Sequence, residues 1–124
     1  MKESVVFDTS FLINCVKAKI NPLHEVKMKL GIYEAIIPGA VMNELENLSQ
    51  KNKFAKVTLE MVKKSQHTVV EGGNNADKSV VYIAAEREAR VASTDKEVRQ
   101  NAKALELKLV TLRKGKYVLI EDNI

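Results

Sequence analysis

The segment Ser4-Val5-Val6-Phe7-Asp8-Thr9-Ser10 places an aspartate directly after a short run of apolar residues. An uninterrupted apolar run with β-branched side chains is typical of a strand that is buried on both faces of a parallel sheet. Ser10 is then the candidate N-cap of a helix that continues through Phe11. The segment therefore predicts a buried strand that ends in a carboxylate and turns directly into a helix.

The same alternation of strand and helix continues along the chain. Further apolar strands are predicted at 33–37, 68–70 and 90–94. Further helices are predicted after Pro22 as far as Gly31, from Pro38-Gly39 onward, and at 53–64, 76–87 and 96–105. Two last apolar segments, 109–112 and 117–120, flank Lys114-Gly115 and predict a closing hairpin or two edge strands. Alternating elements of this kind favour an α/β fold with a mostly parallel sheet.

The helix at 53–64 is expected to be amphipathic. Its spacing of apolar residues predicts an inward face made of Phe54, Val57 and Met61.

Composition narrows the class of protein. The chain has 124 residues, which fits a single domain over residues 1–124. Its one cysteine, Cys15, excludes an internal disulfide and favours a reducing, cytoplasmic environment. No apolar run approaches the roughly 20 residues that span a bilayer, and the N-terminus lacks a signal-peptide pattern, so we expect no membrane partner.

Acidic residues recur where the predicted strands end. Asp8 follows the first strand, Asp95 follows the strand at 90–94, and Asp77 lies in the first turn of the helix after Gly72-Gly73-Asn74-Asn75. Ligands of open parallel sheets bind at the carboxyl edge of the strands. Alone, each aspartate also fits a helix N-cap or the positive end of a helix dipole. Their shared position favours a common site.

Glu44 is the fourth candidate acid. In the helix that begins at Pro38-Gly39, the apolar residues Val41, Leu45 and Leu48 form one stripe. At 100° per residue, Glu44 lies about 67° from the centre of that stripe and Glu46 about 133°. We therefore expect Glu46 to face solvent and Glu44 to border the buried face.

Four carboxylates at one sheet edge would repel one another, and a divalent cation would relieve that repulsion. Carboxylate oxygens suit Mg²⁺ or Mn²⁺, which are bound through a few carboxylates, waters and substrate phosphates. Such ions activate water and stabilise the leaving oxygen in phosphodiester hydrolysis.

Four short motifs together resemble the PIN domain, a family of metal-dependent ribonucleases. They occur in the family's order and are Val5-Val6-Phe7-Asp8-Thr9-Ser10, Val41-Met42-Asn43-Glu44-Leu45, Ala76-Asp77 with Ile83-Ala84-Ala85, and Val91-Ala92-Ser93-Thr94-Asp95. The chain departs from the family at Ser93-Thr94, where Thr-Asn is frequent. The resemblance implies a three-layer α/β/α sandwich and a Mg²⁺- or Mn²⁺-dependent endoribonuclease. It also implies that the metal-binding and catalytic residues are Asp8, Glu44, Asp77 and Asp95.

The resemblance leaves the biological role open. The segment from Val110 to Lys116 is similar to the rRNA-processing branch, which implies an RNA substrate and a ribosome-assembly partner. A VapC-type toxin with a protein antitoxin and a non-catalytic RNA-binding module are the alternatives, and homodimers are common in the family. Phosphotransfer on Asp8 is disfavoured, because Ser10 stands where that chemistry needs a second aspartate.

Charge supports an RNA partner. The net charge is +4, and if four of the 16 acids share one pocket, the 20 basic residues face only 12 acids elsewhere. The basic excess lies toward the C-terminal part of the chain. We expect RNA contacts from Ser10, Thr94, Arg113, Lys114 and Lys116, and Glu97 is a candidate peripheral helper.

Overall fold

The computed structural model describes residues 3–72 and 75–122. Its strands are β1 (Glu3–Phe7), β2 (Tyr33–Pro38), β3 (Thr68–Val70), β4 (Arg90–Ala92), β5 (Leu109–Arg113) and β6 (Tyr117–Glu121). Its helices are α1 (Thr9–Lys17), α2 (Pro22–Leu30), α3 (Gly39–Ser49), α4 (Lys53–Lys64), α5 (Ala76–Arg87) and α6 (Lys96–Ala104). The strands and helices predicted from the sequence are confirmed, with small shifts at some of their ends.

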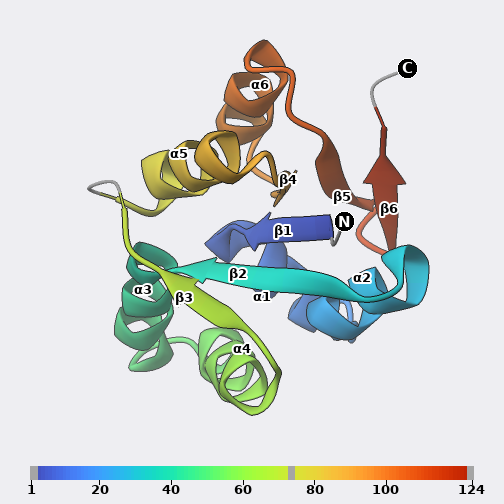
Figure 1. Cartoon of the computed structure of the whole chain (residues 1–124). Coiled ribbons are helices and arrows are strands. Elements are labelled where there is room, and N and C mark those ends of the chain that lie inside the picture. Colours follow the sequence, from blue (N-terminus) through green and yellow to red (C-terminus); the bar gives the residue numbers. More distant parts are fainter. Residues whose placement is uncertain (1–2, 73–74, 123–124) are drawn as a thin grey trace.

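The strands form one sheet in the order β3-β2-β1-β4-β5-β6. All neighbours are parallel except β5 and β6, which form the predicted antiparallel hairpin. In Figure 1 the arrowheads of β1 and β2 point to the same side, so their carboxyl ends share one edge of the sheet. The mostly parallel sheet of the predicted fold is confirmed.

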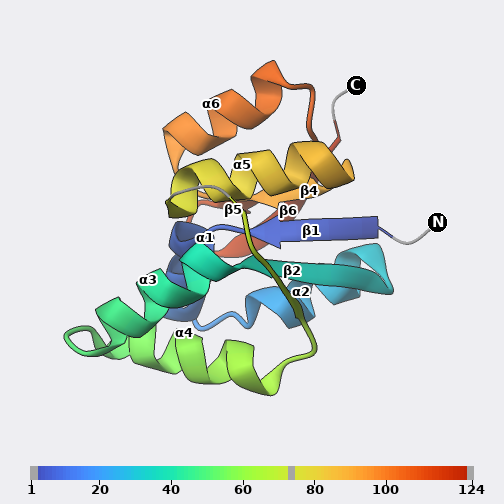
Figure 2. The same cartoon turned by 60° about the vertical axis from the view of Figure 1, so that its left-hand side comes forward.

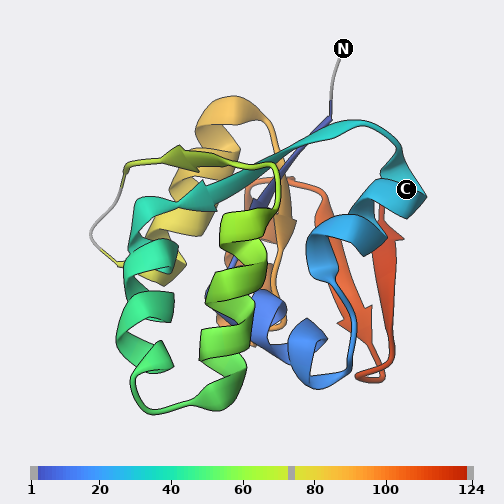
Figure 3. The same ribbon diagram turned by 90° about the horizontal axis from the view of Figure 1, so that it is seen from below.

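Helices cover both faces of this sheet. Figures 1 and 2 show α5 and α6 side by side over one face, with α1 and α2 on the other. The α4 helix packs beside α1 and α3, and α3 also contacts α5 at the carboxyl edge of the sheet. Figure 3 shows α3 and α4 running side by side, with the β5–β6 turn beside the end of α1. This arrangement is the predicted three-layer α/β/α sandwich.

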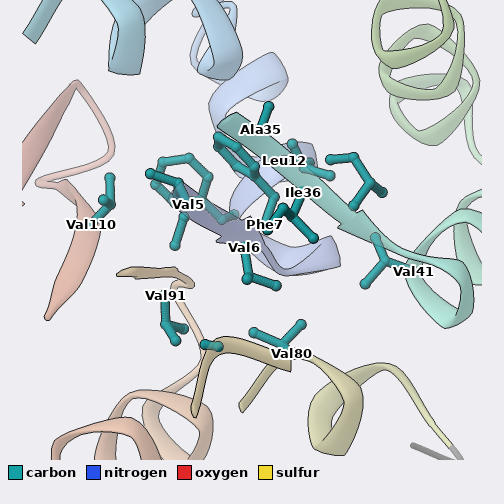
Figure 4. Close-up of a cluster of buried hydrophobic side chains, with 14 of the residues drawn as sticks. Val5, Val6, Phe7, Leu12, Ala35, Ile36, Val41, Val80, Val91 and Val110 are labelled. Carbon is teal, nitrogen blue, oxygen red and sulfur yellow. The ribbon is translucent and has the colours of Figure 1, made fainter. Parts of the chain in front are cut away.

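The core is built around β1. Val5, Val6 and Phe7 are fully buried, as expected for the continuous apolar run, and Phe7 packs against Phe11 with ring centroids 5.9 Å apart. Figure 4 shows Val5, Val6 and Phe7 among side chains from both faces of the sheet. Burying a side chain such as Phe7 stabilises the fold by about 1.5–3 kcal/mol. The strand that delivers Asp8 is therefore rigidly held.

The start of α1 and the end of β4 differ from the boundaries predicted from the sequence. The N-cap of α1 is Asp8, whose side chain accepts a hydrogen bond from the backbone N–H of Thr9, so the assignment of Ser10 as N-cap was wrong. Aspartate caps a helix as well as serine does, and Asp8 comes directly after the strand. The β4 strand ends at Ala92 rather than at residue 94, because Ser93 and Thr94 turn toward α6.

The inward face of α4 also differs. The expected inward position of Val57 was wrong, because this side chain is 52% exposed, and neither Phe54 nor Met61 is fully buried. The buried residues of the helix are Ala55, Thr58, Leu59 and Val62. Thr58 tolerates burial because its hydroxyl donates to the carbonyl of Phe54 at 2.6 Å.

The apolar stripe of α3 is shorter than expected. Val41 and Leu45 are fully buried, whereas Leu48 is 38% exposed near the end of the helix.

No helix among residues 3–72 and 75–122 is both long and apolar enough to cross a membrane.

Candidate active site

Asp8 is the most buried acid of the site. Its side chain lies at the carboxyl end of β1 and is 2% exposed. Oδ1 accepts from the Thr9 N–H at 2.9 Å, and Oδ2 accepts from Ser10 Oγ at 3.1 Å and Ser93 Oγ at 2.7 Å. The backbone N–H of Asp8 donates to the Ala92 carbonyl at 2.9 Å. Both carboxylate oxygens are therefore fixed in direction.

Asp8 is harder to ionise than an exposed aspartate. Burial raises the pKa of its carboxyl group, and the charge of Asp77 raises it further. The hydrogen bonds from Ser93, Ser10 and Thr9 lower this pKa without cancelling the rise. A bound cation would stabilise the ionised form of Asp8 at this position.

Ser93 connects Asp8 to the start of α6. Its hydroxyl donates to Asp8 and accepts from the backbone N–H of Asp95 at 3.0 Å. Asp95 in turn caps α6, because its Oδ1 accepts from the Val98 N–H at 3.0 Å. The capping role that the sequence allowed for Asp95 is thus real, and it holds this carboxylate at the carboxyl edge of the sheet.

Asp77 lies close enough to the remaining acids for their charges to act on it. Its pKa is raised first by partial burial and then by the negative charges of Asp95, Glu44 and Glu97. These acids belong to three different helices or their caps, so only the fold brings them together. Asp77 and Glu97 line a pocket of about 540 Å³, and Glu44 lines a neighbouring one of about 350 Å³. Asn75, the N-cap of α5, lines both pockets.

The four sequence-predicted acids therefore lie at one edge, with Asp8 buried and Asp77 largely exposed. Glu44 is exposed, as Glu46 is, so the expected difference in exposure between these two glutamates is not found. Within the described part of the chain, no three Asp, Glu, His or Cys side chains are close enough to bind one ion together. Mg²⁺ keeps several waters and is usually bound by only one or two carboxylates. The carboxylate set fits a largely hydrated Mg²⁺ or Mn²⁺ that some of the acids bind directly and others through water.

Two of the residues expected to contact RNA also organise the site. Ser10 Oγ donates to Asp8 and accepts from the Thr94 N–H at 3.3 Å. Thr94 Oγ1 accepts from Asn14 Nδ2 at 2.9 Å. These bonds fix the β4–α6 loop against α1.

The basic candidates lie at the turn of the hairpin. Arg113, Lys114 and Lys116 are exposed, and Gly115 at the same turn lines a pocket of about 390 Å³ together with Thr94 and Lys17. The hairpin turn is thus at the same edge as the acids. His24 and His67 line a separate pocket of about 570 Å³ beside the amino end of β2, away from this edge.

Ser93 is the site residue that sequence patterns alone did not single out. In the sequence it stands only as a departure from the family motif. The sequence signal that could have found Ser93 is its position between a buried strand and Asp95. Ser10 is likewise a hydroxyl residue close to an acid, Asp8. The partner of its hydroxyl is 85 residues away, so local sequence could not reveal it.

The fold and this arrangement of acids define a PIN-like domain. The chain belongs to the PIN-like domain family, whose pattern matches residues 5–115. No curated protein matches the chain significantly.

Solved structures share the fold at low sequence identity. The PIN domain endonuclease Utp24 has a TM-score of 0.79 and 22% identity, over 98% of this chain and 96% of that one. A domain of a functionally unknown protein from Methanocaldococcus jannaschii has a TM-score of 0.68 and 21% identity, with the same coverage of 98% and 96%. A PilT N-terminus domain protein from Sulfolobus solfataricus has a TM-score of 0.55 and 14% identity, over 90% and 89%.

Proposed function

We propose that the protein is a metal-dependent endoribonuclease in which Asp8, Glu44, Asp77 and Asp95 bind Mg²⁺ or Mn²⁺ directly or through water. One observation carries the proposal. Carboxylates gather at one edge of the sheet, where burial and then the charges of Asp95 and Glu44 raise the pKa of Asp77, and where Asp8 is itself buried. Acids gathered in this way are the environment that a divalent cation requires.

In this proposal the serines and the acids have separate roles. Ser10 and Ser93 hold Asp8 Oδ2 in one direction, and Ser93 also holds the N–H of Asp95, so the two acids keep a fixed relation. A bound divalent ion supplies an activated water and neutralises charge on the cleaved phosphate. Without the ion, the acids repel an RNA backbone, so productive binding and metal binding depend on each other.

Basic residues at the same edge account for RNA binding. Lys114 and Lys116 at the hairpin turn and Lys17 at the end of α1 place positive charge at the same edge of the sheet as the acids. Lysine side chains bind phosphates largely without regard to sequence, so they position the RNA chain. Positive charge at this edge attracts the RNA backbone toward the carboxylates.

The biological role that we propose for this nuclease is processing of ribosomal RNA precursors in the cytoplasm. Its support is the resemblance of residues 110–116 to that branch of the family, together with the position of the hairpin turn at the same edge of the sheet as the acids. The solved structure with the TM-score of 0.79 is that of a PIN domain endonuclease. A VapC-type toxin would be recognised by cleavage of a small RNA set and by inhibition through an antitoxin.

The test is cleavage of end-labelled structured RNA, including precursor ribosomal RNA, with Mn²⁺, Mg²⁺ or a chelator. Asp8→Asn and Glu44→Gln should abolish or strongly reduce cleavage. Glu46→Gln, on the same helix as Glu44 and exposed, is the matched control and should cleave as the wild type does.

Three results would overturn parts of this proposal. Cleavage that persists in Asp8→Asn would assign the activity to a contaminant. RNA binding without cleavage, and without metal binding in calorimetry, would make the protein a non-catalytic RNA-binding module. Equal activity on unrelated structured RNAs would reject the ribosomal role while leaving the nuclease in place.

A further inference from the structure

A pocket of about 540 Å³ between α5 and α6 opens directly beside the acids and has a different chemistry from them. Asp77 and Glu97 line it on the acidic side. Val81 and Val98 contribute apolar surface, and Tyr82 and Asn101 complete the lining. The pocket thus continues from the candidate metal site into a groove with apolar, aromatic and amide surface.

Tyr82 is the exceptional residue of this groove. It is 56% exposed, which leaves a large aromatic surface open to solvent on α5. Its ring lies close to Gly72, because a Cβ atom added at Gly72 would be in van der Waals contact with Tyr82 Cδ2 at 3.4 Å. The carbonyl of Gly72 accepts a hydrogen bond from Ser79 Oγ, which ties Gly72 to α5. The ring therefore has Gly72 near one side and remains accessible to solvent.

Polar groups accompany the aromatic surface. Asn101 lies one turn after Glu97 on α6 and is exposed, and its amide supplies both a donor and an acceptor. Lys78 lies one turn before Tyr82 and adds a positive charge to the lining. An aromatic plane, apolar walls and an amide are the groups that recognise an unstacked nucleobase.

We infer that the groove between α5 and α6 binds one base of the RNA, stacked on Tyr82 with its edge on the Asn101 amide, next to the phosphate that is cleaved. This inference rests on the proposed endoribonuclease function and identifies a subsite of the same centre. Asp77 and Glu97 line the same pocket, so a phosphate at the acids and a base on Tyr82 belong to one nucleotide or to neighbours. The two carboxylates also disfavour an anionic occupant, whereas a base is neutral.

The subsite predicts that an unstacked base is read close to the cleavage position. Base–aromatic stacking contributes about 1–3 kcal/mol, which corresponds to about 5- to 150-fold in affinity. Tyr82→Ala should weaken binding of single-stranded RNA by a factor in this range, whereas Tyr82→Phe keeps the ring and should bind as the wild type does. Met28→Ala, which removes another exposed large apolar side chain from α2, is the control and should leave this interaction unchanged.

The experiment combines these variants with oligonucleotides that lack one base at a time. Dissociation constants are measured by fluorescence anisotropy with Mn²⁺ on cleavage-resistant oligonucleotides, and KM and kcat with Mn²⁺ on cleavable ones. At one position, removal of the base should weaken wild-type binding at least as much as Tyr82→Ala does, and should have a much smaller effect in Tyr82→Ala, where only the Asn101 contact is left to lose. Independent, multiplicative effects of the two changes at every position would overturn the subsite, as would wild-type affinity in Tyr82→Ala.

The readouts separate the two proposals. If the wild type binds RNA but does not cleave it, the nuclease proposal fails, and the dissociation constants still decide the subsite. If cleavage depends on metal and Asp8 while Tyr82→Ala has no effect on KM or affinity, the subsite fails alone. If the groove instead binds an aromatic side chain of a protein partner, RNA affinity will be indifferent to Tyr82, which rejects the inference.

Discussion

Ser93 Oγ donates a hydrogen bond to Asp8 Oδ2 at 2.7 Å across the boundary between β4 and β1, and both side chains are buried. The same hydroxyl accepts from the Asp95 N–H at 3.0 Å. One small side chain therefore fixes a strand-end carboxylate and the beginning of the helix that carries the next one. Pre-set carboxylates of this kind need little reorganisation when a metal ion binds.

Ser93→Ala should lower both stability and cleavage. The substitution removes one of the hydroxyl donors of the buried Asp8 and the acceptor of the Asp95 N–H, so the free energy of unfolding should fall by about 1–3 kcal/mol. Urea denaturation measures this loss, and metal titration should show weaker affinity as well. Ser49→Ala is the control, because its exposed hydroxyl bonds the Glu46 carbonyl of its own helix. Equal effects of the two substitutions would contradict the linking role of Ser93.

The metal-free protein should lose stability as the pH rises from acid toward neutral. The pKa of Asp8 is raised above its ordinary value of 3.8, chiefly by burial, so the folded state holds this proton more tightly than the unfolded chain. The stability that this proton contributes is complete below the unfolded pKa and is lost as the pH passes through the folded pKa. The slope approaches about 1.4 kcal/mol per pH unit for each proton.

The comparison that isolates Asp8 uses Asp8→Asn in the presence of a chelator. Urea denaturation across the acid-to-neutral range should show the wild type losing stability relative to the variant. Added Mn²⁺ at neutral pH should raise the Tm of the wild type more than that of Asp8→Asn, since only the carboxylate is a ligand. Parallel stability profiles for the two proteins would contradict the raised pKa.

Much of the fold was predictable because its signals are local. The buried run Val5-Val6-Phe7 identified the central strand, and the structure buries all three side chains. The position of Asp8 and Asp95 after their strands followed from the same local pattern.

What the sequence could not predict depends on contacts between distant residues. The face that α4 buries is set by its packing beside α1 and α3, which favours the small Ala55 over the larger Phe54. The bond between Ser93 and Asp8 forms only after β1 and β4 pair, and the groove beside Tyr82 forms only after α5 and α6 pack together. Roles for the individual acids stay predictions until they are tested by substitution.

Gly39 and Glu71 should be energetically coupled at the start of α3. No side chain caps this helix, and a Cβ atom at Gly39 would overlap the Glu71 carboxylate, which lies against the first residue of the helix. An anion at a helix N-terminus contributes about 0.3–1 kcal/mol. Gly39→Ala should therefore displace Glu71 and lose part of this stabilisation.

A double-mutant cycle measures that coupling. In Glu71→Ala, the clash is absent and Gly39→Ala should be neutral or stabilising, because alanine is the better helix former. Urea denaturation should show that Gly39→Ala changes the free energy of unfolding less favourably in the wild type than in Glu71→Ala. If the effects of the two substitutions on the free energy of unfolding are strictly additive, the Glu71 carboxylate moves aside without loss of stability.

Lys114→Gln and Lys116→Gln should weaken RNA binding and leave metal binding intact. Both lysines lie at the hairpin turn, beside a pocket shared with Thr94, so their charges act on the RNA backbone near the acids. Each lysine that contacts a phosphate contributes about one to the slope of log affinity against log salt. The double variant should show a smaller slope in anisotropy titrations and unchanged Mn²⁺ affinity in calorimetry. Lys63→Gln with Lys64→Gln is the matched control, since it removes the same charge from the end of α4, toward the amino edge of the sheet. An equal loss of RNA affinity in the control would show that net charge, rather than the position of the hairpin turn, governs binding.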